Sequence, residues 1–420
     1  MLRRRPTKAE PVQAFLTDLR VALRNLVRQR RRAAIAVSAI LFGVIALLLA
    51  GGFIEWILWS LREGSIRSHL GHVQIMRPGY LKAGAASPFD YLMPSRPELE
   101  NRIGALPGVR AMGPRMSFSG LASHGDSTIS FIGEAVDPEK EHIMSRLVKI
   151  SKGDELSIHE PRGIIMGMGL AKSMGVGVGD TVVLMAGTAS GGINAVECRI
   201  RGLFFTVTKA YDDSALRMPI ATARELLRVA GSHVWVVLLE KTEDTPAVLR
   251  QMRATTTGAD IAFVPWWELA GTYQQTVTLF KRQVGVMELI IGIIIVLSIS
   301  NTLMMSVMER TGEIGTAMAL GIRRSRVLRQ FLIEGTMLGV VGGAAGVLIG
   351  WPLALIVSWI GIPMPPPPGV SVPITAEIFV NAPLAAEAFA LAFLTTAVAS
   401  LYPAWKASRM EIVNALRFNR

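Results

Sequence analysis

The sequence of 420 residues contains one cysteine, Cys198. A single thiol excludes an intrachain disulfide and any metal site built from several cysteines. Charged side chains are also scarce, at 18% of the chain, whereas an ordinary soluble domain carries about 25%. Half of the residues are hydrophobic. This composition excludes a disordered or collagen-like chain and indicates a membrane protein.

Charge is almost absent from four long apolar runs. A helix needs about 20 such residues to cross the hydrocarbon layer of a membrane. We predict four spans, at residues 33–60, 284–308, 335–360 and 387–405. Their acidic residues lie near the predicted outer ends and are Glu55, Glu288 and Glu387. The lack of an ionisable group in the middle of any span argues against an ion-coupled transporter or a hydrophilic channel.

The basic residues cluster on one side of these spans. Residues 1–32, 309–334 and 406–420 together hold 19 basic and 6 acidic residues, and the whole chain has a net charge of +12. By the positive-inside rule, these three segments are cytoplasmic, and residues 61–283 and 361–386 are extracytoplasmic. We therefore predict a multi-pass protein of the inner (cytoplasmic) membrane. Because the basic residues flank spans, they do not indicate nucleic-acid binding.

Residues 61–283 have the mixed pattern of an α+β domain. Short apolar runs between turn residues predict strands at 128–133, 181–185, 198–205 and 233–239. Helical spacing predicts short helices at 97–105, 169–174 and 221–229. The predicted fold class is a polytopic α-helical membrane protein with four transmembrane helices and a large α+β extracytoplasmic domain between the first two.

Two other segments have patterns that permit two interpretations each. Residues 1–32 carry a stripe of Phe15, Leu16, Leu19, Leu23, Leu26 and Val27, with arginines on another face. This stripe favours an amphipathic helix on the inner leaflet over a plain basic anchor. The loop at 361–386 is proline-rich and contains four consecutive prolines. It favours a stiff spacer over a docking surface for a partner.

The third span carries glycines in two helical rows. The rows are Gly335, Gly339 and Gly343, and Gly342, Gly346 and Gly350. Small residues let helix backbones approach closely within lipid. The pattern favours close packing inside one subunit, with a contact between subunits as the alternative.

The sequence has no motif for nucleotide hydrolysis. The nearest string to a phosphate-binding loop, Gly167–Ser173, has the wrong glycine spacing. The histidines all lie between residues 61 and 283 and are interpreted as surface or packing residues: His69, His72, His124, His142, His159 and His233. We therefore predict a non-catalytic chain with no metal and no cofactor of its own.

The energy for any transport must then come from a partner, and the cytoplasmic segment 309–334 is the candidate contact. Its string Glu309-Arg-Thr-Gly-Glu-Ile-Gly315, followed by Ala319 and Gly321, resembles the pattern of the FtsX-like permease superfamily, which includes the MacB and LolC/LolE types. Ala22–Asn25, Gly167–Asp180 and Tyr402–Ser408 with Ala415–Arg417 are also similar to family segments. The proline usual before the final Ala-Leu pair is absent here.

The resemblance implies a subunit of a dimeric ABC transporter. An ATPase dimer on separate chains, with ATP and Mg²⁺, would bind the N-terminal helix and the coupling residues Glu309, Arg310, Thr311, Gly312, Glu313, Ile314, Gly315, Ala319, Leu320 and Gly321. The second permease would be another copy or a paralogue. The outer domains of the transporter would move and would transfer the substrate to a periplasmic carrier or adaptor.

The sequence does not identify the substrate, and three functions remain possible. The first is extraction of a lipid or lipoprotein from the outer leaflet, for which the resemblance suggests contacts at Leu48, Phe53, Ile54, Ile57, Val286, Leu289 and Ile290. Plain lipid-facing packing is the alternative for those residues. The second function is MacB-like efflux through an adaptor and an outer-membrane duct, and the third is FtsX-like signalling to a cell-wall hydrolase. The separate ATPase and the apolar outer half of the first span favour lipid or lipoprotein extraction.

Overall fold

The computed structural model describes residues 20–25, 27–28, 30–84, 86–145, 148–206, 209–256, 260–364 and 374–412. The chain forms two compact units. We call residues 1–58, 277–362 and 375–420 the helical unit, and residues 59–276 and 363–374 the sheet unit. Several sequence features lie outside the described residues, namely Phe15, Leu16, Leu19, Leu26, most of the proline-rich segment and Ala415–Arg417.

Four helices of the described residues are long and apolar enough to cross a membrane, which confirms the four predicted spans. They are α2 (Arg30–Ser65), α11 (Gly271–Glu309), α13 (Arg324–Ile360) and α14 (Ala382–Ser408). A π-helical turn, η1 (Ile66–Leu70), continues α2. The helices exceed the apolar runs because charged turns such as Arg62–Glu63 and Lys281–Arg282 extend them.

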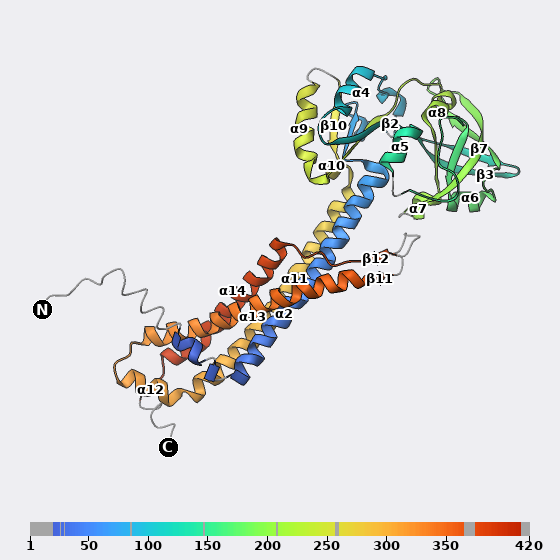
Figure 1. Ribbon diagram of the computed structural model, residues 1–420. Coiled ribbons are helices and arrows are strands. Elements are labelled where there is room, and N and C mark those ends of the chain that lie inside the picture. Colours follow the sequence, from blue (N-terminus) through green and yellow to red (C-terminus); the bar gives the residue numbers. More distant parts are fainter. Residues whose placement is uncertain are drawn as a thin grey trace. The chain divides into compact units, whose positions relative to one another are not determined.

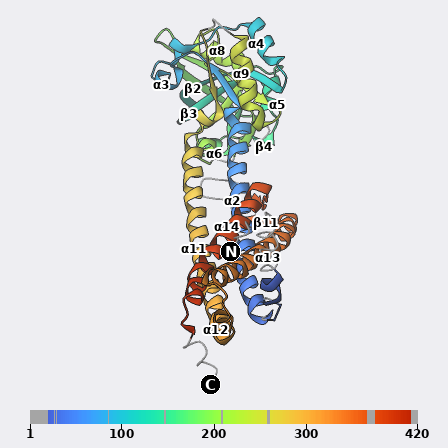
Figure 2. The ribbon, with the colours of Figure 1, turned by 90° about the vertical axis from the view of Figure 1, so that its left-hand side faces the viewer.

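The two glycine rows of α13 each accommodate a different neighbouring helix within the same chain. Figure 2 shows the helices concerned, α2 and α14, beside α13. A Cβ added at Gly342 or Gly346 would lie 2.8 or 2.6 Å from the Cβ atoms of Ile40 and Val44 in α2. The row Gly335, Gly339 and Gly343 instead faces side chains of α14. The prediction of close packing inside one subunit is therefore confirmed.

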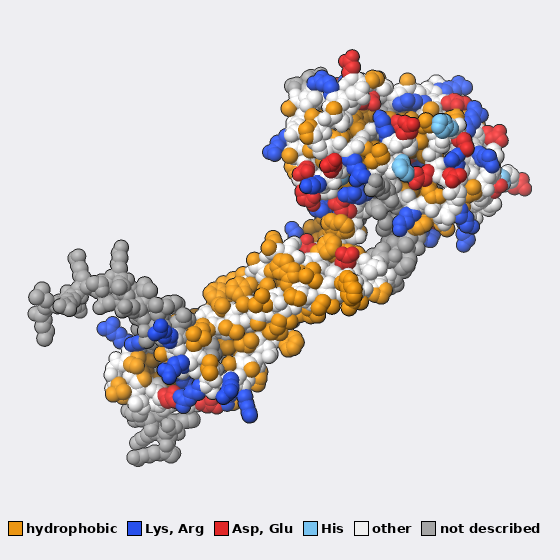
Figure 3. Space-filling model, in the orientation of Figure 1, with side chains coloured by type: hydrophobic (Ala, Val, Ile, Leu, Met, Phe, Trp, Pro, Cys, Tyr) orange, Lys and Arg blue, Asp and Glu red, His pale blue; other side chains and the backbone are white. Residues whose placement is uncertain are grey.

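The outer surface of the helical unit is apolar. Between 28% and 39% of the residues in each spanning window are buried within the chain. Figure 3 shows hydrophobic side chains covering the long helices and Lys and Arg side chains gathered at the end that carries the α11–α13 connection. That distribution fits a membrane-embedded bundle with one basic end.

The sheet unit contains a ten-stranded sheet (Figure 1). The strand order is β10-β1-β9-β2-β3-β8-β5-β7-β4, and β6 pairs with β2 and β7. The strands are β1 (Val73–Met76), β2 (Val109–His124), β3 (Ser127–Val136), β4 (Lys149–Gly153), β5 (Gly163–Gly167), β6 (Thr181–Gly187), β7 (Ile193–Phe205), β8 (Ala215–Pro219), β9 (Val234–Leu239) and β10 (Ala262–Pro265). A separate pair joins β11 (Ile362–Met364) to β12 (Ile374–Ala376).

Short helices cover the sheet and close its cores. They are α3 (Tyr80–Ala83), α4 (Pro97–Gly104), α5 (Pro138–Met144), α6 (Met168–Met174), α7 (Lys209–Asp212), α8 (Ile220–Leu227), α9 (Thr245–Thr255) and α10 (Trp266–Leu269), with η2 (Pro88–Tyr91) and η3 (Thr242–Asp244). One core lies around Phe131 and includes residues of α6 and α8. A second lies around Trp235 and includes residues of α4 and α9.

All four predicted strands and all three predicted helices of this domain are present, with ends shifted by a few residues. The sequence analysis missed β1, β2, β4, β5, β8 and β10. The longest of these, β2, runs for 16 residues and contributes to both cores. Gly113, Pro114 and Gly120 interrupt the apolar pattern of β2. Glycine and proline are unfavourable inside strands, so their presence argued against a strand here.

Candidate functional site

The connection between α11 and α13 forms a short helix with a small core of its own. This helix, α12, spans Thr311–Ala319. Its buried residues Ile314 and Met318 pack on α13 and α14, at Val327, Phe331, Ala404 and Ala407. Because its base is packed against two spanning helices, α12 forms a platform rather than a loose loop.

A buried ion pair ties the start of α12 to α13. The Arg310 Nη1 atom donates to both carboxylate oxygens of Glu334, at 3.0 and 3.3 Å. Glu334 is 3% exposed. The Arg310 guanidinium also lies over the Phe331 ring, 5.5 Å from its centroid, and its Nε atom lies 3.5 Å from Glu313 Oε2. One guanidinium nitrogen thus serves both carboxylate oxygens, and such charge-assisted hydrogen bonds are stronger than neutral ones.

The helical segment before α2 joins the same network. Asn25 Nδ2 donates to Glu334 Oε1 at 2.6 Å, and Arg28 Nη1 lies 3.3 Å from Glu313 Oε1. Arg32 pairs with Glu309. The sequence analysis named the N-terminal helix and the coupling residues as the two contacts of one ATPase, and in the structure the two segments lie in contact.

The exposed tip of the connection follows α12. Leu320 is 83% exposed and Ile322 is 39% exposed. Between them Gly321 has φ +95°, a backbone conformation that glycine adopts without strain. Of the ten predicted coupling residues, Ile314 and Gly315 are buried in the base. The exposed ones are Glu309, Glu313, Ala319, Leu320 and Gly321, and the half-buried ones are Arg310, Thr311 and Gly312.

The sequence analysis gave no role to the partners of this network. Glu334, Arg28 and Arg32 were not among the predicted site residues. Asn25 and Glu334 are 309 positions apart, so no local spacing could pair them. The only available signal was the acidic residue Glu334 directly before the apolar run 335–360, where an unpaired charge is costly once buried.

The predicted lipid-contact residues differ in exposure: those on α2 are buried or half-buried, and those on α11 are exposed. Leu48 is fully buried, where its Cδ1 atom would lie 2.9 Å from a Cβ added at Gly350, and Ile54 is 8% exposed. Phe53 and Ile57 are half-buried. The three residues of α11 are exposed at 56%, 64% and 52%, and they are Val286, Leu289 and Ile290. A ligand reaches Leu48 only if the helices separate, so a role for that residue stays a prediction.

The sheet unit contains a buried cluster of two arginines and two glutamates. Arg115 of β2 lies 3.1 Å from Glu134 of β3 and 2.9 Å from Glu141 of α5. Arg217 of β8 lies 2.6 Å and 3.1 Å from the same two carboxylates. Burial alone would raise the pKa of Glu134, but the two guanidinium groups hold that pKa well below its usual range. The charges balance, as buried charges must.

This cluster also holds the end of the first spanning helix and its π-helical extension. Arg217 Nη2 donates to the Ser68 carbonyl oxygen at 3.1 Å, and Ser145 Oγ donates to the same oxygen at 3.2 Å. Arg115 donates to the His69 carbonyl oxygen. The last carbonyl groups of a helix have no partner within the helix. Here buried side chains from three elements of the sheet unit supply those partners.

A second set of buried hydrogen bonds, centred on His72, attaches the last turns of α2 to the sheet unit. The Leu239 amide donates to His72 Nδ1 at 3.0 Å, so the ring proton lies on Nε2, which donates to Thr242 Oγ1 at 3.0 Å. Thr242 in turn donates to Glu63 of α2 at 2.7 Å. Burial lowers the pKa of His72 to about 4. The neutral ring is therefore part of the attachment.

We expect this histidine to make folding sensitive to acid. The unfolded chain binds a proton on His72 below its ordinary pKa of 6.5, whereas the folded chain binds it only near pH 4. Lowering the pH between these values therefore favours unfolding, by up to about 3 kcal/mol. Unfolding of the full chain in detergent should show a shallower loss of stability over this range for His72→Gln than for the unchanged chain. Equal slopes would contradict the assignment.

Within the described ranges, no group of three or more His, Cys, Asp or Glu residues is placed to hold a metal ion. His72 and His233 are buried, and His142 pairs with Glu155 at 2.7 Å. Cys198 is also buried, which raises the pKa of its thiol to about 12.

Two family descriptions match the chain. Residues 33–255 match the MacB-like periplasmic core domain, and residues 285–412 match the FtsX-like permease C-terminal region. The first match alone covers more than half of the sequence. Together they include most of the four spanning helices, the α12 platform and the sheet unit up to residue 255.

Similar proteins include two types of bacterial exporter. The chain is 38% identical over 145 residues to the pyoverdine export ATP-binding/permease protein PvdT of Pseudomonas savastanoi pv. phaseolicola. The aligned region covers 34% of this chain and 19% of that protein. It is 35% identical over 151 residues to the macrolide export ATP-binding/permease protein MacB of Syntrophobacter fumaroxidans, covering 36% and 19%. The chain thus matches about a fifth of the length of these relatives.

Among solved structures, the periplasmic region of MacB from Actinobacillus actinomycetemcomitans is similar over 52% of this chain and 98% of that chain. The two share 12% sequence identity and a TM-score of 0.36. Family membership therefore rests on the two family matches rather than on this superposition.

Proposed function

Because this chain belongs to the FtsX-like/MacB permease superfamily, we propose that it is the membrane subunit of an ABC transporter. A separate ATPase dimer hydrolyses ATP with Mg²⁺ and binds the tip of the α11–α13 connection and the N-terminal helix. A second permease, either another copy or a paralogue, completes the complex. The sheet unit then lies on the periplasmic side of the inner membrane.

The observation that best supports this proposal is an exposed apolar tip on a buried base. Leu320 and Ile322 are exposed where a partner can bind them, while Ile314 and Met318 anchor α12 to the bundle. The Arg310–Glu334 pair and its neighbours join α12 to α13 and to the N-terminal helix. A partner that pushes on the tip therefore moves whole helices rather than bending a loop.

The cargo is handled at the outer side of the membrane rather than through a polar pore. We propose lipid or lipoprotein extraction as the first form of this function, because Val286, Leu289 and Ile290 leave an exposed apolar strip on α11. Efflux of a periplasmic substrate through an adaptor is the second form. It is supported by the names of the similar exporters, which refer to pyoverdine and macrolide export.

Native mass spectrometry of the tagged chain, purified from its host in nanodiscs, tests this proposal. We expect two permeases and two ATPases. A bound acylated mass supports extraction, and a periplasmic adaptor without such a mass supports efflux. If no ATPase is bound to the purified chain under these conditions, the assignment as an ABC permease is wrong.

A further inference from the structure

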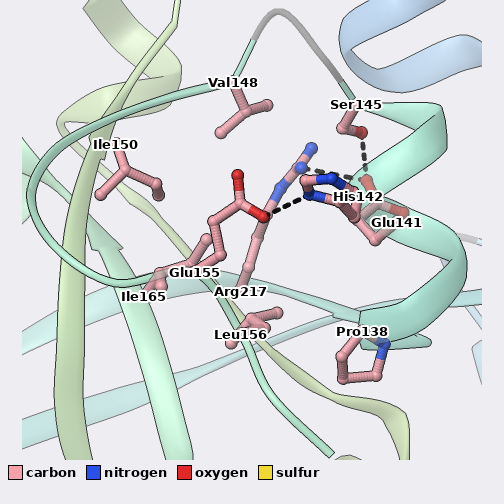
Figure 4. Close-up of a pocket in the computed structure, with 10 residues that line it drawn as sticks. All are labelled: Pro138, Glu141, His142, Ser145, Val148, Ile150, Glu155, Leu156, Ile165 and Arg217. Carbon is pink, nitrogen blue, oxygen red and sulfur yellow. Dashed lines mark hydrogen bonds and ion pairs between the residues drawn. The ribbon is translucent and has the colours of Figure 1, made fainter.

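The sheet unit contains a cavity of about 350 Å³ that the proposed function does not use. It lies among α5, β4, β5, β8 and the loop after β4, and its walls include Val148, Ile150, Leu156, Ile165 and Pro138 (Figure 4). Ligand-binding cavities in proteins commonly measure about 300–1,000 Å³ and are mostly apolar with a few polar groups. This cavity therefore has the size of a small-molecule site, and its lining is divided between five apolar and five polar or charged residues.

The polar groups of the cavity lie at its base and at its rim. Arg217 and Glu141 are buried at the base, with side chains 2% and 12% exposed. At the rim, His142 Nδ1 lies 2.7 Å from Glu155 Oε2, and Figure 4 shows the Glu155 carboxyl group turned toward the His142 ring. Both rim side chains are more than half exposed. A ligand can therefore displace this contact at little cost.

The charge of the lining favours a cation. Arg217 is matched by Glu141 at the base, and Arg115 is matched by Glu134 behind it. Glu155 is the remaining carboxylate of the lining, and its Oε2 atom contacts His142 Nδ1 at the rim. Among the side-chain contacts of the described residues, the Glu155 carboxylate has one, to His142. A carboxylate with spare acceptor capacity beside an apolar wall suits an ammonium group on an apolar body.

We propose that this cavity is a binding site for a small organic monocation, with its ammonium group on Glu155 and its apolar body against Ile150, Leu156 and Ile165. The site shares Arg217, Glu141 and Ser145 with the attachment of η1, since Arg217 and Ser145 both donate to the Ser68 carbonyl oxygen. A bound ligand thus contacts the groups that hold the end of the first spanning helix and its extension.

Protection of an engineered cysteine tests the site in the full chain in nanodiscs. Ile150→Cys is alkylated with a maleimide in the presence of 2-phenylethylammonium, 2-phenylethanol or 3-phenylpropionate, which are similar in shape and differ in charge. The native Cys198 contributes little background, because it is 1% exposed. Ile193→Cys, at a site 83% exposed in the same unit, is the matched control. Leu156→Cys is the second reporter should position 150 react slowly.

We expect the ammonium probe to protect Cys at position 150 at a concentration about tenfold lower than the alcohol, as a charge-assisted hydrogen bond allows. The carboxylate probe should not protect. Adding Glu155→Gln should remove the difference between the ammonium probe and the alcohol. Equal protection by all three probes, no protection by any, or a preference that survives Glu155→Gln overturns the proposal. These results do not depend on an ATPase, so failure here is distinct from failure of the transporter assignment.

Discussion

Replacing Arg217 with alanine is expected to remove about 3–5 kcal/mol from the stability of the sheet unit, because it leaves a buried carboxylate without its partner. Arg217 is 2% exposed and contacts Glu134, Glu141 and the Ser68 carbonyl oxygen. A typical folded domain is stable by only about 5–15 kcal/mol. The variant should therefore lose a large part of its stability and unfold at a clearly lower denaturant concentration.

The matched control for this variant is Arg162→Ala. Arg162 also pairs with a glutamate, Glu225, at 3.0 Å, but both side chains are more than half exposed. An exposed pair contributes about 0–1 kcal/mol. Denaturant unfolding of the full chain in detergent, followed by far-ultraviolet circular dichroism, measures both. The cluster has no special structural role if Arg217→Ala and Arg162→Ala differ by less than 1 kcal/mol.

Arg217→Lys separates charge from geometry in the same cluster. Lysine keeps one positive charge near Glu134 but cannot reproduce the four contacts that the guanidinium makes with Glu134, Glu141, Tyr211 and Ser68. We therefore expect a loss of stability between those of the two alanine variants. A loss as small as that of the control would show that the charge alone is needed.

The sequence was sufficient to predict the four spans and part of the sheet unit, namely four of the ten strands and three of the eight α-helices found among its described residues. Apolar runs and turn residues are local signals, and their length and period are read directly from the chain. The two glycine rows of α13 could likewise be assigned to packing within one chain, since each row needs a neighbour of matching shape. The strand β2 was missed because Gly113, Pro114 and Gly120 obscured its local pattern.

The ion networks could not be predicted in the same way. Arg115, Glu134, Glu141 and Arg217 come from four elements, and each looks like an ordinary surface charge in the sequence. Their pairing is created by the order of the strands, which places β2, β3 and β8 side by side. The Asn25–Glu334 contact likewise depends on two helices that are distant in sequence. The predicted coupling residues lie on one segment, and their role stays a prediction, while the side chains that contact this segment from other helices were not predicted.

Replacing Leu320 with aspartate is expected to abolish ATPase activity that depends on the permease, with little effect on folding. Leu320 is 83% exposed at the tip of the α11–α13 connection, so a charge there remains in water in the free chain. In a complex the same charge would be buried against the partner without a counter-ion. An uncompensated polar group costs about 1–3 kcal/mol and a charge costs more, which corresponds to at least about a tenfold weaker complex.

Ile193→Asp is the matched control, because Ile193 is also 83% exposed and lies on β7 of the sheet unit. Co-purification of the ATPase and turnover of ATP in nanodiscs are measured for both variants, beside the unfolding temperature of each permease. The proposed coupling role requires that Leu320→Asp loses the partner while Ile193→Asp keeps it, at equal unfolding temperatures. If both variants retain the ATPase and its turnover, the tip is not the contact, and the polar residues of the platform, Glu309 and Glu313, become the surface to test. Loss of the ATPase in both variants would show that the effect is not specific to the tip. The sheet unit would then also be needed for assembly of the complex.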